Sequence, residues 1–218
     1  MIPPIPDPDP GRRERKRQQT LDHLAATAFA LFERQGFDAV TMEQIAAEAD
    51  VAKGTLYNHF PVKEALLAHQ FHGEIARGAQ GLAASLAERE SFVARLSGWL
   101  QVSADWCQSR RPYLPHYLRF RFMSLDARTR GRDPSRSGME RLFQALIEAA
   151  QGAGEVRADL PAEHLAALLQ HLYLGALMRW VAVDDDASQE RSQTRLENEF
   201  AAVVDLFVHG AGRAQERA

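Results

Sequence analysis

The side chains best suited to sequence-specific hydrogen bonding gather in one short segment, residues 53–59, which reads Lys-Gly-Thr-Leu-Tyr-Asn-His. If this segment is a helix, Leu56 faces inward and the other side chains can face outward. Small, polar and basic side chains on one helix face can reach base edges in a DNA groove, while their neighbours hold phosphates. The residues that would face outward are Lys53, Gly54, Thr55, Tyr57, Asn58 and His59.

Two further residues flank this segment at positions suited to phosphate contact. Thr41 and Gln44 match a capping box, so Thr41 should begin a helix whose N-terminus can also donate to a phosphate. Lys63 falls in the first turn of a later helix, where a cation opposes the helix dipole. An external anion would explain this lysine, and a surface lysine without a role is the alternative.

Several of these residues can also be explained without a role in DNA binding. Gly54 costs a helix about 1 kcal/mol relative to alanine. Close approach to DNA would explain it, but a glycine at a helix start can also lack a role. Tyr57 suits a phosphate oxygen and can also be half buried. His59 has no partner at metal-ligand spacing, so we predict no metal site and no cofactor.

The elements that must position these residues are all helices. Helical periodicity appears nearly everywhere, and no strand-like alternation persists. The pattern predicts an all-α protein, with an N-terminal three-helix bundle that contains a helix-turn-helix and a larger C-terminal helical domain. The predicted helices span residues 17–35, 41–49, 53–59, 62–78, 90–110, 112–125, 137–152, 161–183 and 188–210.

A longer pattern surrounds the polar segment. It comprises Thr41, Ile45-Ala46, Ala49-Asp50-Val51, the run from Lys53 to Phe60, and Lys63-Glu64-Ala65-Leu66. In this pattern the chain resembles the TetR family of bacterial transcriptional regulators over roughly residues 17–67. The resemblance implies a homodimer that reads a palindromic operator with one DNA-binding head per subunit. By matching positions, it implies that Lys53, Gly54, Thr55, Tyr57 and His59 meet the DNA, and that Thr41 and Lys63 hold its backbone.

Two positions depart from the family pattern. Asp50 stands where a turn glycine is common, and aspartate tolerates left-handed backbone angles better than most residues. Ala52 stands where a serine usually caps the recognition helix. Its methyl group should weaken the cap by about 1 kcal/mol. We expect the turn to survive both changes.

The C-terminal part is rich in aromatic residues that can form either a helical core or an apolar pocket with a few polar groups. The core is the plainer interpretation for any single residue. Family members hold an inducer in this region, so the resemblance implies a small, mostly apolar effector. The candidate pocket residues are Trp99, Trp106, Tyr113, Tyr117, Phe120, Phe143, His171 and Tyr173.

The last two predicted helices carry long apolar stripes. Two such helices from each subunit would form a four-helix bundle across a two-fold axis. Packing within one subunit is the alternative, and the family resemblance favours the dimer. The candidate dimer face comprises Leu165, Leu168, Leu172, Ala176, Leu196, Phe200, Val203 and Phe207.

Composition sets outer limits on these hypotheses. The chain has 218 residues, a net charge of -3 and one cysteine, Cys107. A disulfide within the chain and a cysteine-based metal site are therefore excluded. The N-terminus lacks a signal-peptide core, and no apolar run is long enough to span a membrane. We expect a cytoplasmic protein that has no membrane partner.

The chain divides into four predicted segments. Residues 1–16 form a disordered, proline-rich and basic arm, 17–64 the DNA-binding domain, 65–212 the effector and dimerisation domain, and 213–218 a flexible tail. The basic residues at 12–17 can follow the DNA backbone. A solvated charged leader explains them equally well.

Together these features predict a DNA-binding transcriptional regulator, most simply a repressor released from its operator by a small molecule. The alternatives are a helical enzyme and a helical adaptor that does not bind DNA. The sequence lacks a glycine-rich phosphate loop, a nucleophile elbow and an HExxH motif, so we predict no enzyme and no catalytic residue. Retained DNA binding after substitution of Tyr57 and Lys63 would favour the alternatives.

Overall fold

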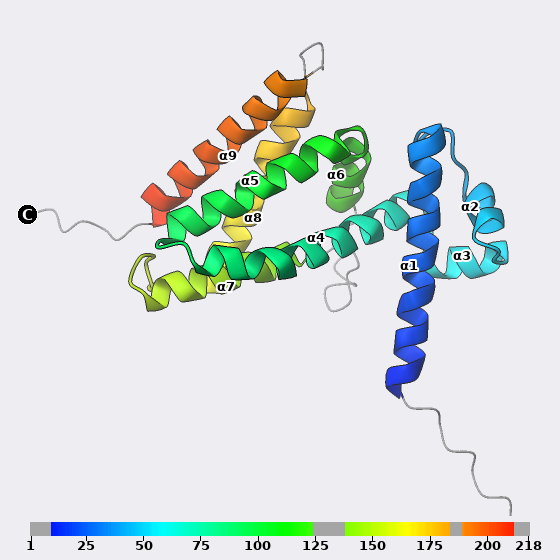
Figure 1. Cartoon of the computed structure of the whole chain (residues 1–218), viewed down its shortest axis with the longest axis horizontal. Coiled ribbons are helices and arrows are strands. Elements are labelled where there is room, and N and C mark those ends of the chain that lie inside the picture. Colours follow the sequence, from blue (N-terminus) through cyan, green and yellow to red (C-terminus); the bar gives the residue numbers. More distant parts are fainter. Residues whose placement is uncertain (1–9, 124–137, 184–188, 212–218) are drawn as a thin grey trace, which may run out of the picture. The chain divides into compact units, whose positions relative to one another are not determined.

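The computed structural model describes residues 10–123, 138–183 and 189–211, and within these ranges every regular element is a helix (Figure 1). The described residues fall into two compact units, the first ending at Gly73 and the second beginning at Glu74. The all-helical fold agrees with the sequence prediction. The predictions for residues 1–9 and 213–218 concern segments outside the described residues.

The first unit contains α1 (Pro10–Gln35), α2 (Met42–Glu48), α3 (Lys53–His59) and the start of α4 (Lys63–Ala87). Leu24, Ala28 and Phe32 recur at helical spacing along α1 and are buried. Ile45 from α2, Leu56 from α3 and Phe71 from α4 are completely buried in the same unit. Each helix is short or amphipathic, so packing of these apolar faces holds the bundle together.

Two helix ends differ from the sequence prediction. We expected α1 to begin near Arg17, but it begins at Pro10. Proline is favourable at the first helical position, and Arg17 forms an ion pair of 3.0 Å with Glu14 one turn earlier. We expected α4 to end at Gly78, but it continues to Ala87 because Leu86 still packs into the core.

The second unit contains the rest of α4, α5 (Phe92–Arg110), a short 3-10 helix η1 (Arg111–Tyr113), α6 (Leu114–Met123), α7 (Met139–Gly152), α8 (Ala162–Val181) and α9 (Gln189–Ala211). Helix α8 packs against α7 and α9, and α5 packs against α9 (Figure 1). An aromatic cluster fills the centre of the second unit. There the centre of the Tyr173 ring lies 5.6 Å from that of Trp99 and 5.1 Å from that of Phe200.

Candidate functional site

Thr41 fixes the start of the helix-turn-helix. Its hydroxyl accepts a hydrogen bond from the Gln44 amide at 3.2 Å, and the Gln44 side chain accepts one from the Thr41 amide at 2.8 Å. This reciprocal pair is the predicted capping box, and it satisfies two backbone donors that a helix start leaves open. The geometry leaves the Thr41 side chain exposed at the head of α2.

The turn between α2 and α3 depends on Asp50. Its φ angle is 51°, the one positive value among the described residues other than glycines. The predicted left-handed conformation is therefore confirmed, and the Val51 amide then donates to the Ala46 carbonyl at 3.0 Å. Ala52 precedes α3 in an extended conformation and its side chain makes no capping bond, as the sequence also predicted.

Helix α3 is oriented by two apolar residues. Leu56 is completely buried and Phe60 nearly so, which turns the opposite face of this short helix outward. Tyr57 is 39% exposed, and a Cβ atom added at Gly54 would meet nothing within 4 Å. The fold itself therefore does not require Gly54. The outward residues are Lys53, Gly54, Thr55, Tyr57 and Asn58, whereas His59 is half buried.

Lys63 has an internal role that the sequence did not reveal. Its ammonium donates to the backbone carbonyls of Phe37 at 2.7 Å, Val40 at 3.2 Å and Asp38 at 3.3 Å. It also lies 4.5 Å from the centre of the Phe37 ring. These contacts tie the start of α4 to the loop before Thr41. The external anion expected from the helix dipole is therefore not needed to explain Lys63.

Lys53, the first residue of α3, also has a partner within the motif. Its ammonium forms an ion pair with the carboxylate of Glu43 in the first turn of α2. The same ammonium lies 5.7 Å from the centre of the Tyr57 ring. Hydrogen bonding to Lys53 lowers the pKa of Glu43, and the same bond raises the pKa of Lys53. The outward face of α3 thus includes a lysine that already has an anionic neighbour.

The second unit contains a small cavity of about 80 Å³ that is partly open to solvent. It contains three of the eight candidate pocket residues, Trp99, Trp106 and Tyr173. Phe143 supports the wall, since its ring lies 5.0 Å from Trp99 and is fully buried. The complete lining is Glu74, Ile75, Gly78, Leu82, Trp99, Val102, Ser103, Trp106, Met139 and Tyr173.

The other four candidates do not line this cavity. Tyr117 is buried on α6, and Tyr113 and Phe120 are half buried on η1 and α6. His171 was predicted as a polar pocket group, and this is wrong for the cavity observed. It is exposed, and its Nδ1 lies 2.6 Å from the Ala167 carbonyl of its own helix. Two residues along a helix rotate by about 200°, so an inward Tyr173 places His171 outward.

Glu74 is a cavity residue that the sequence analysis missed. Its carboxylate accepts hydrogen bonds from the Trp106 indole at 2.8 Å and from Arg110 at 3.1 and 3.3 Å. Three bonds therefore connect the α4 wall of the cavity to the α5 wall. One sequence signal was present, because Glu74 and Gly78 are spaced four residues apart and so share one face of α4.

A buried polar cluster adjoins the same cavity. The Tyr173 hydroxyl lies 2.8 Å from Ser103 Oγ and 3.6 Å from Cys107 Sγ. Burial raises the pKa of the Cys107 thiol to about 11 and also raises the pKa of Tyr173. Both groups are therefore neutral at physiological pH. Ser103 and Tyr173 both line the cavity, so two hydroxyl groups lie at one edge of its mostly apolar wall.

The predicted dimer face needs correction. The structure buries six of its eight residues inside this subunit, where α8 and α9 pack on the rest of the unit, so they cannot form an outer face. Leu168 is exposed and Leu172 half buried. The six buried residues are Leu165, Ala176, Leu196, Phe200, Val203 and Phe207.

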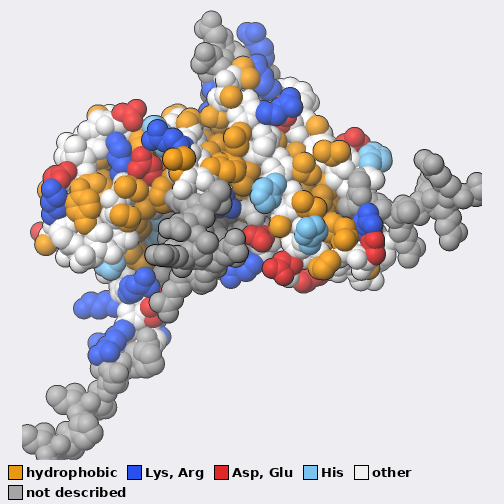
Figure 2. Space-filling view, turned by 180° about the vertical axis from the view of Figure 1, so that it is seen from behind, with side chains coloured by type: hydrophobic (Ala, Val, Ile, Leu, Met, Phe, Trp, Pro, Cys, Tyr) orange, Lys and Arg blue, Asp and Glu red, His pale blue; other side chains and the backbone are white. Residues whose placement is uncertain are grey.

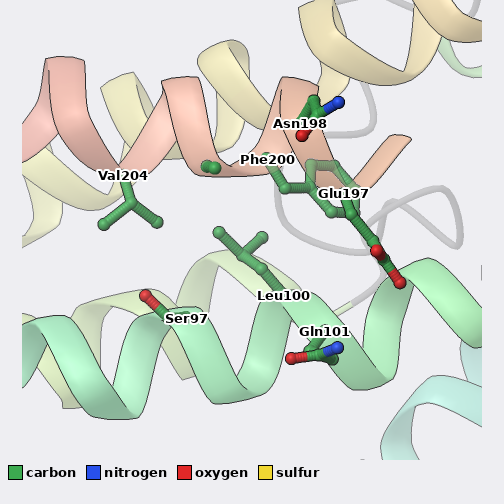
Figure 3. A pocket seen from close by; sticks show the side chains of 8 residues that line it. Ser97, Leu100, Gln101, Glu197, Asn198, Phe200 and Val204 are labelled. Atoms are coloured by element: carbon green, nitrogen blue, oxygen red, sulfur yellow. The ribbon is translucent and has the colours of Figure 1, made fainter. Parts of the chain in front are cut away.

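Phe200 illustrates this correction. An open hollow of about 270 Å³ lies between α5 and α9, with Leu100, Phe200 and Val204 among its lining residues (Figure 3). Figure 3 shows the Phe200 ring projecting from α9 towards Leu100 on α5. The aromatic side chain thus belongs to the contact between two helices of one subunit. None of the candidate pocket residues lines this hollow.

The described residues contain no group of three or more His, Cys, Asp or Glu side chains placed to bind a metal ion. Among the described helices, none combines the length and the apolar character that crossing a membrane requires. The polar face of α3 and the cavity of the second unit are the features that the fold builds. They define a class of protein, a helical helix-turn-helix protein with a separate unit that contains a cavity.

Comparisons with known proteins identify the family. The protein-family model described as "Bacterial regulatory proteins, tetR family" matches residues 24–69 of this chain. The HTH-type transcriptional repressor KstR of Mycolicibacterium smegmatis is 30% identical over 171 residues, which are 78% of this chain and 78% of that protein. The chain belongs to the TetR family. It is therefore a DNA-binding transcriptional regulator.

Solved structures show the same fold. Thermus thermophilus FadR in complex with lauroyl-CoA has a TM-score of 0.74 and 23% identity, covering 91% of this chain and 98% of that chain. Bacillus subtilis FadR in complex with stearoyl-CoA has a TM-score of 0.58 and 16% identity, covering 86% and 97%. Both crystallised proteins hold an acyl-CoA.

Proposed function

We propose that this regulator binds a palindromic operator as a homodimer, with α3 of each subunit in the major groove, and that a small molecule in the second unit releases it. The observation that carries this proposal is the outward face of α3. A capping box and a left-handed turn position the helix, and Leu56 and Phe60 orient it. Exposed polar side chains on such a helix are suited to reading base edges.

Each polar residue has a proposed role. Lys53, Gly54, Thr55, Asn58 and His59 meet the DNA in the groove, and Gly54 allows its backbone close approach. The Tyr57 hydroxyl and the exposed Thr41 side chain contact phosphates. Lys63 acts indirectly, by holding the loop that precedes Thr41 through three carbonyls.

Substitutions in α3 test this proposal. Thr55→Ala and Tyr57→Ala should each weaken operator binding by roughly ten- to hundredfold, because each removes a contact made only in the complex. The helical signal in circular dichroism should stay unchanged, since both side chains are exposed. Gln35→Ala, at the exposed end of α1, is the matched control. Unchanged operator binding by both α3 variants would support the adaptor alternative.

The N-terminal part of α1 provides an additional basic surface. Figure 2 shows Lys and Arg side chains gathered along this part of the helix. Because the segment is helical from Pro10, the proposed contact is a helix lying along the phosphate backbone rather than an extended arm. The exposed basic residues are Arg12, Arg13, Arg15, Lys16 and Arg17.

The cavity supports a release mechanism. At about 80 Å³ it is much smaller than the roughly 300–1,000 Å³ of a typical ligand site. We propose that a ligand of ordinary size moves its walls apart, and α4 supplies Glu74, Ile75, Gly78 and Leu82 to one wall. The same continuous helix begins at Lys63 in the first unit. We propose that this helix couples effector and operator, by a typical coupling energy of about 1–3 kcal/mol.

The proposed effector is small and mostly apolar. Trp99, Trp106 and Met139 offer apolar surface, whereas Glu74, Ser103 and Tyr173 offer a few polar groups. Acyl-CoA thioesters are the first compounds to test, because two proteins of this fold hold them and an acyl chain matches an apolar wall. Lauroyl-CoA should release operator DNA in a titration, and lauric acid and CoA alone are the controls.

The proposed dimer uses the exposed stripe of α8 and α9 in place of the buried residues. Leu168, Met178 and Leu206 are 46%, 46% and 60% exposed. Arg179 and Glu199 link the two helices at 3.2 Å beside them. Two such pairs of helices would form a four-helix bundle across a two-fold axis. Leu206→Asp should therefore yield monomers in size-exclusion chromatography with light scattering.

We further propose a division of labour between the two units. The first is the DNA-binding domain, and the second binds the effector and the partner subunit. A regulator that binds chromosomal operators works in the cytoplasm. The single cysteine, buried at Cys107, agrees with this location.

A further inference from the structure

An acidic side chain adjoins the surface that is proposed to meet DNA. Glu43 lies in the first turn of α2, and its carboxylate pairs with the ammonium of Lys53, the first residue of α3. The side chains are 54% and 59% exposed, so neither is withdrawn into the core. The carboxylate of Glu43 therefore pairs with Lys53, which is the single Lys or Arg residue of α3.

Such an acid opposes DNA affinity. Phosphates act on charges within a Debye length, about 8 Å at physiological ionic strength. A carboxylate on this side repels them and reduces the counterion release that Lys53 would otherwise contribute. The dipole of α2 favours an acid anywhere in its first turn. The dipole does not explain why Glu43 pairs with Lys53 of α3. DNA affinity does not explain the pair either, because the carboxylate weakens DNA binding.

We propose that Glu43 is a positioning residue that improves operator discrimination by holding Lys53 against α3. The inference rests on the proposed function, in which α3 reads the operator. An unpaired lysine binds a phosphate of any sequence. A lysine held by Glu43 and by the face of Tyr57 stays along α3, where it meets the operator and adds little to sequence-independent binding.

A pair of variants tests this role. Glu43→Gln removes the charge, and Glu48→Gln is the matched control, because Glu48 lies on the same helix and pairs with Arg34 of α1 at 2.9 Å. Both variants lose one negative charge from an exposed ion pair. Affinity is measured by fluorescence anisotropy across a salt series, with two probes. One is a random-sequence duplex, and the other is the duplex that the wild type selects from a randomised pool.

For Glu43→Gln, we expect random-duplex affinity to rise roughly two- to fivefold, the range that an exposed ion pair supports. The slope of log affinity against log salt should steepen by about 0.9, one additional phosphate contact. Affinity for the selected duplex should not rise. The specificity ratio, which is the affinity for the selected duplex divided by that for the random duplex, therefore falls. Glu48→Gln should leave the ratio unchanged, and Lys53→Ala should abolish the effect of Glu43→Gln.

Other outcomes overturn the inference. Equal behaviour of Glu43→Gln and Glu48→Gln would reduce the effect to net charge. A parallel rise for both probes would make Glu43 a general repulsive charge. An effect that persists in the Lys53→Ala background would exclude action through Lys53. If instead the wild type binds neither probe at low salt, the proposed function itself fails, and this result is distinct from the others.

Discussion

The two compact units differ in where their functional side chains lie. In the first unit they are exposed along α3, on a scaffold set by neighbours in sequence such as Thr41 and Gln44. In the second unit the cavity is lined from helices far apart in sequence, and residues such as Trp99 and Tyr173 are also buried core residues. Recognition and folding are therefore separable in the first unit and coupled in the second.

The largest expected effect is a loss of stability of the first unit when a core residue is truncated. Leu56→Ala removes a completely buried side chain and should cost about 2–5 kcal/mol of stability. Operator binding should be lost, while the second unit stays folded. All three tryptophans, Trp99, Trp106 and Trp180, belong to the second unit, so their fluorescence reports that unit alone. In urea, circular dichroism should show an earlier transition than fluorescence.

The same experiment includes a built-in control. The wild-type fluorescence transition provides the reference for the second unit. If Leu56→Ala shifts the fluorescence and dichroism transitions together by the full amount, the two units unfold as one, and the separation described above is wrong.

The second prediction concerns alkaline pH and the buried thiol. The folded pKa of Cys107 is raised from an ordinary value of 9.0 to about 11. The unfolded chain therefore releases this proton first, so stability is intact below pH 9 and falls as pH rises from about 9 to 11. The loss amounts to about 2–3 kcal/mol. Urea midpoints from tryptophan fluorescence at several pH values measure it.

Cys107→Ala isolates this contribution from other titrating groups. The variant should show a shallower decline of stability between pH 9 and 11 than the wild type. Identical pH profiles would contradict the buried, neutral state of the thiol.

A smaller effect on stability tests whether the cavity residues also belong to the core. Tyr173→Phe removes a hydroxyl that lies 2.8 Å from buried Ser103 Oγ. Leaving that oxygen without this partner should cost about 1–3 kcal/mol. His171→Ala, on the exposed side of the same helix, should change stability by less than about 0.5 kcal/mol. Comparable losses in both variants, measured by chemical denaturation, would mean that the two faces of α8 do not differ.

The smallest effects concern the helix caps of the first unit. Thr41→Ala removes the hydroxyl that accepts from the Gln44 amide, keeps the bond from the Thr41 amide to the Gln44 side chain, and should destabilise the unit by about 1 kcal/mol. Ala52→Ser adds a cap that α3 lacks and should stabilise it by a similar amount. Thermal unfolding followed by circular dichroism measures both. Two changes of the same sign would show that the caps do not control these helices.

The sequence predicted the first unit well because its signals are local. The capping box, the Asp50 turn and the bounds of α3 depend on residues within a few positions of one another. Lys63 shows where this reasoning ends. Its carbonyl partners lie 23 to 26 residues earlier, and the sequence contains no sign of that contact.

For the second unit, the sequence predicted where the helices lie but not which face of each helix is buried. An apolar stripe at helical spacing looks the same whether a helix packs inside its own subunit or against a partner. Phe200 and Leu206 show the difference, since one is buried and the other 60% exposed. The cavity likewise brings Glu74 beside Trp106 and Arg110, a contact set by how α4 packs on α5.

The central claim is that α3 enters the major groove twice per dimer. Hydroxyl-radical footprinting of the duplex selected by the wild-type protein tests it most directly. We predict two protected half-sites whose centres lie about one DNA turn, roughly 34–36 Å, or a multiple of it apart. Both should vanish together in the Thr55→Ala, Tyr57→Ala double variant. A footprint that persists in this variant, or no protection by the wild type at low salt, would contradict the account.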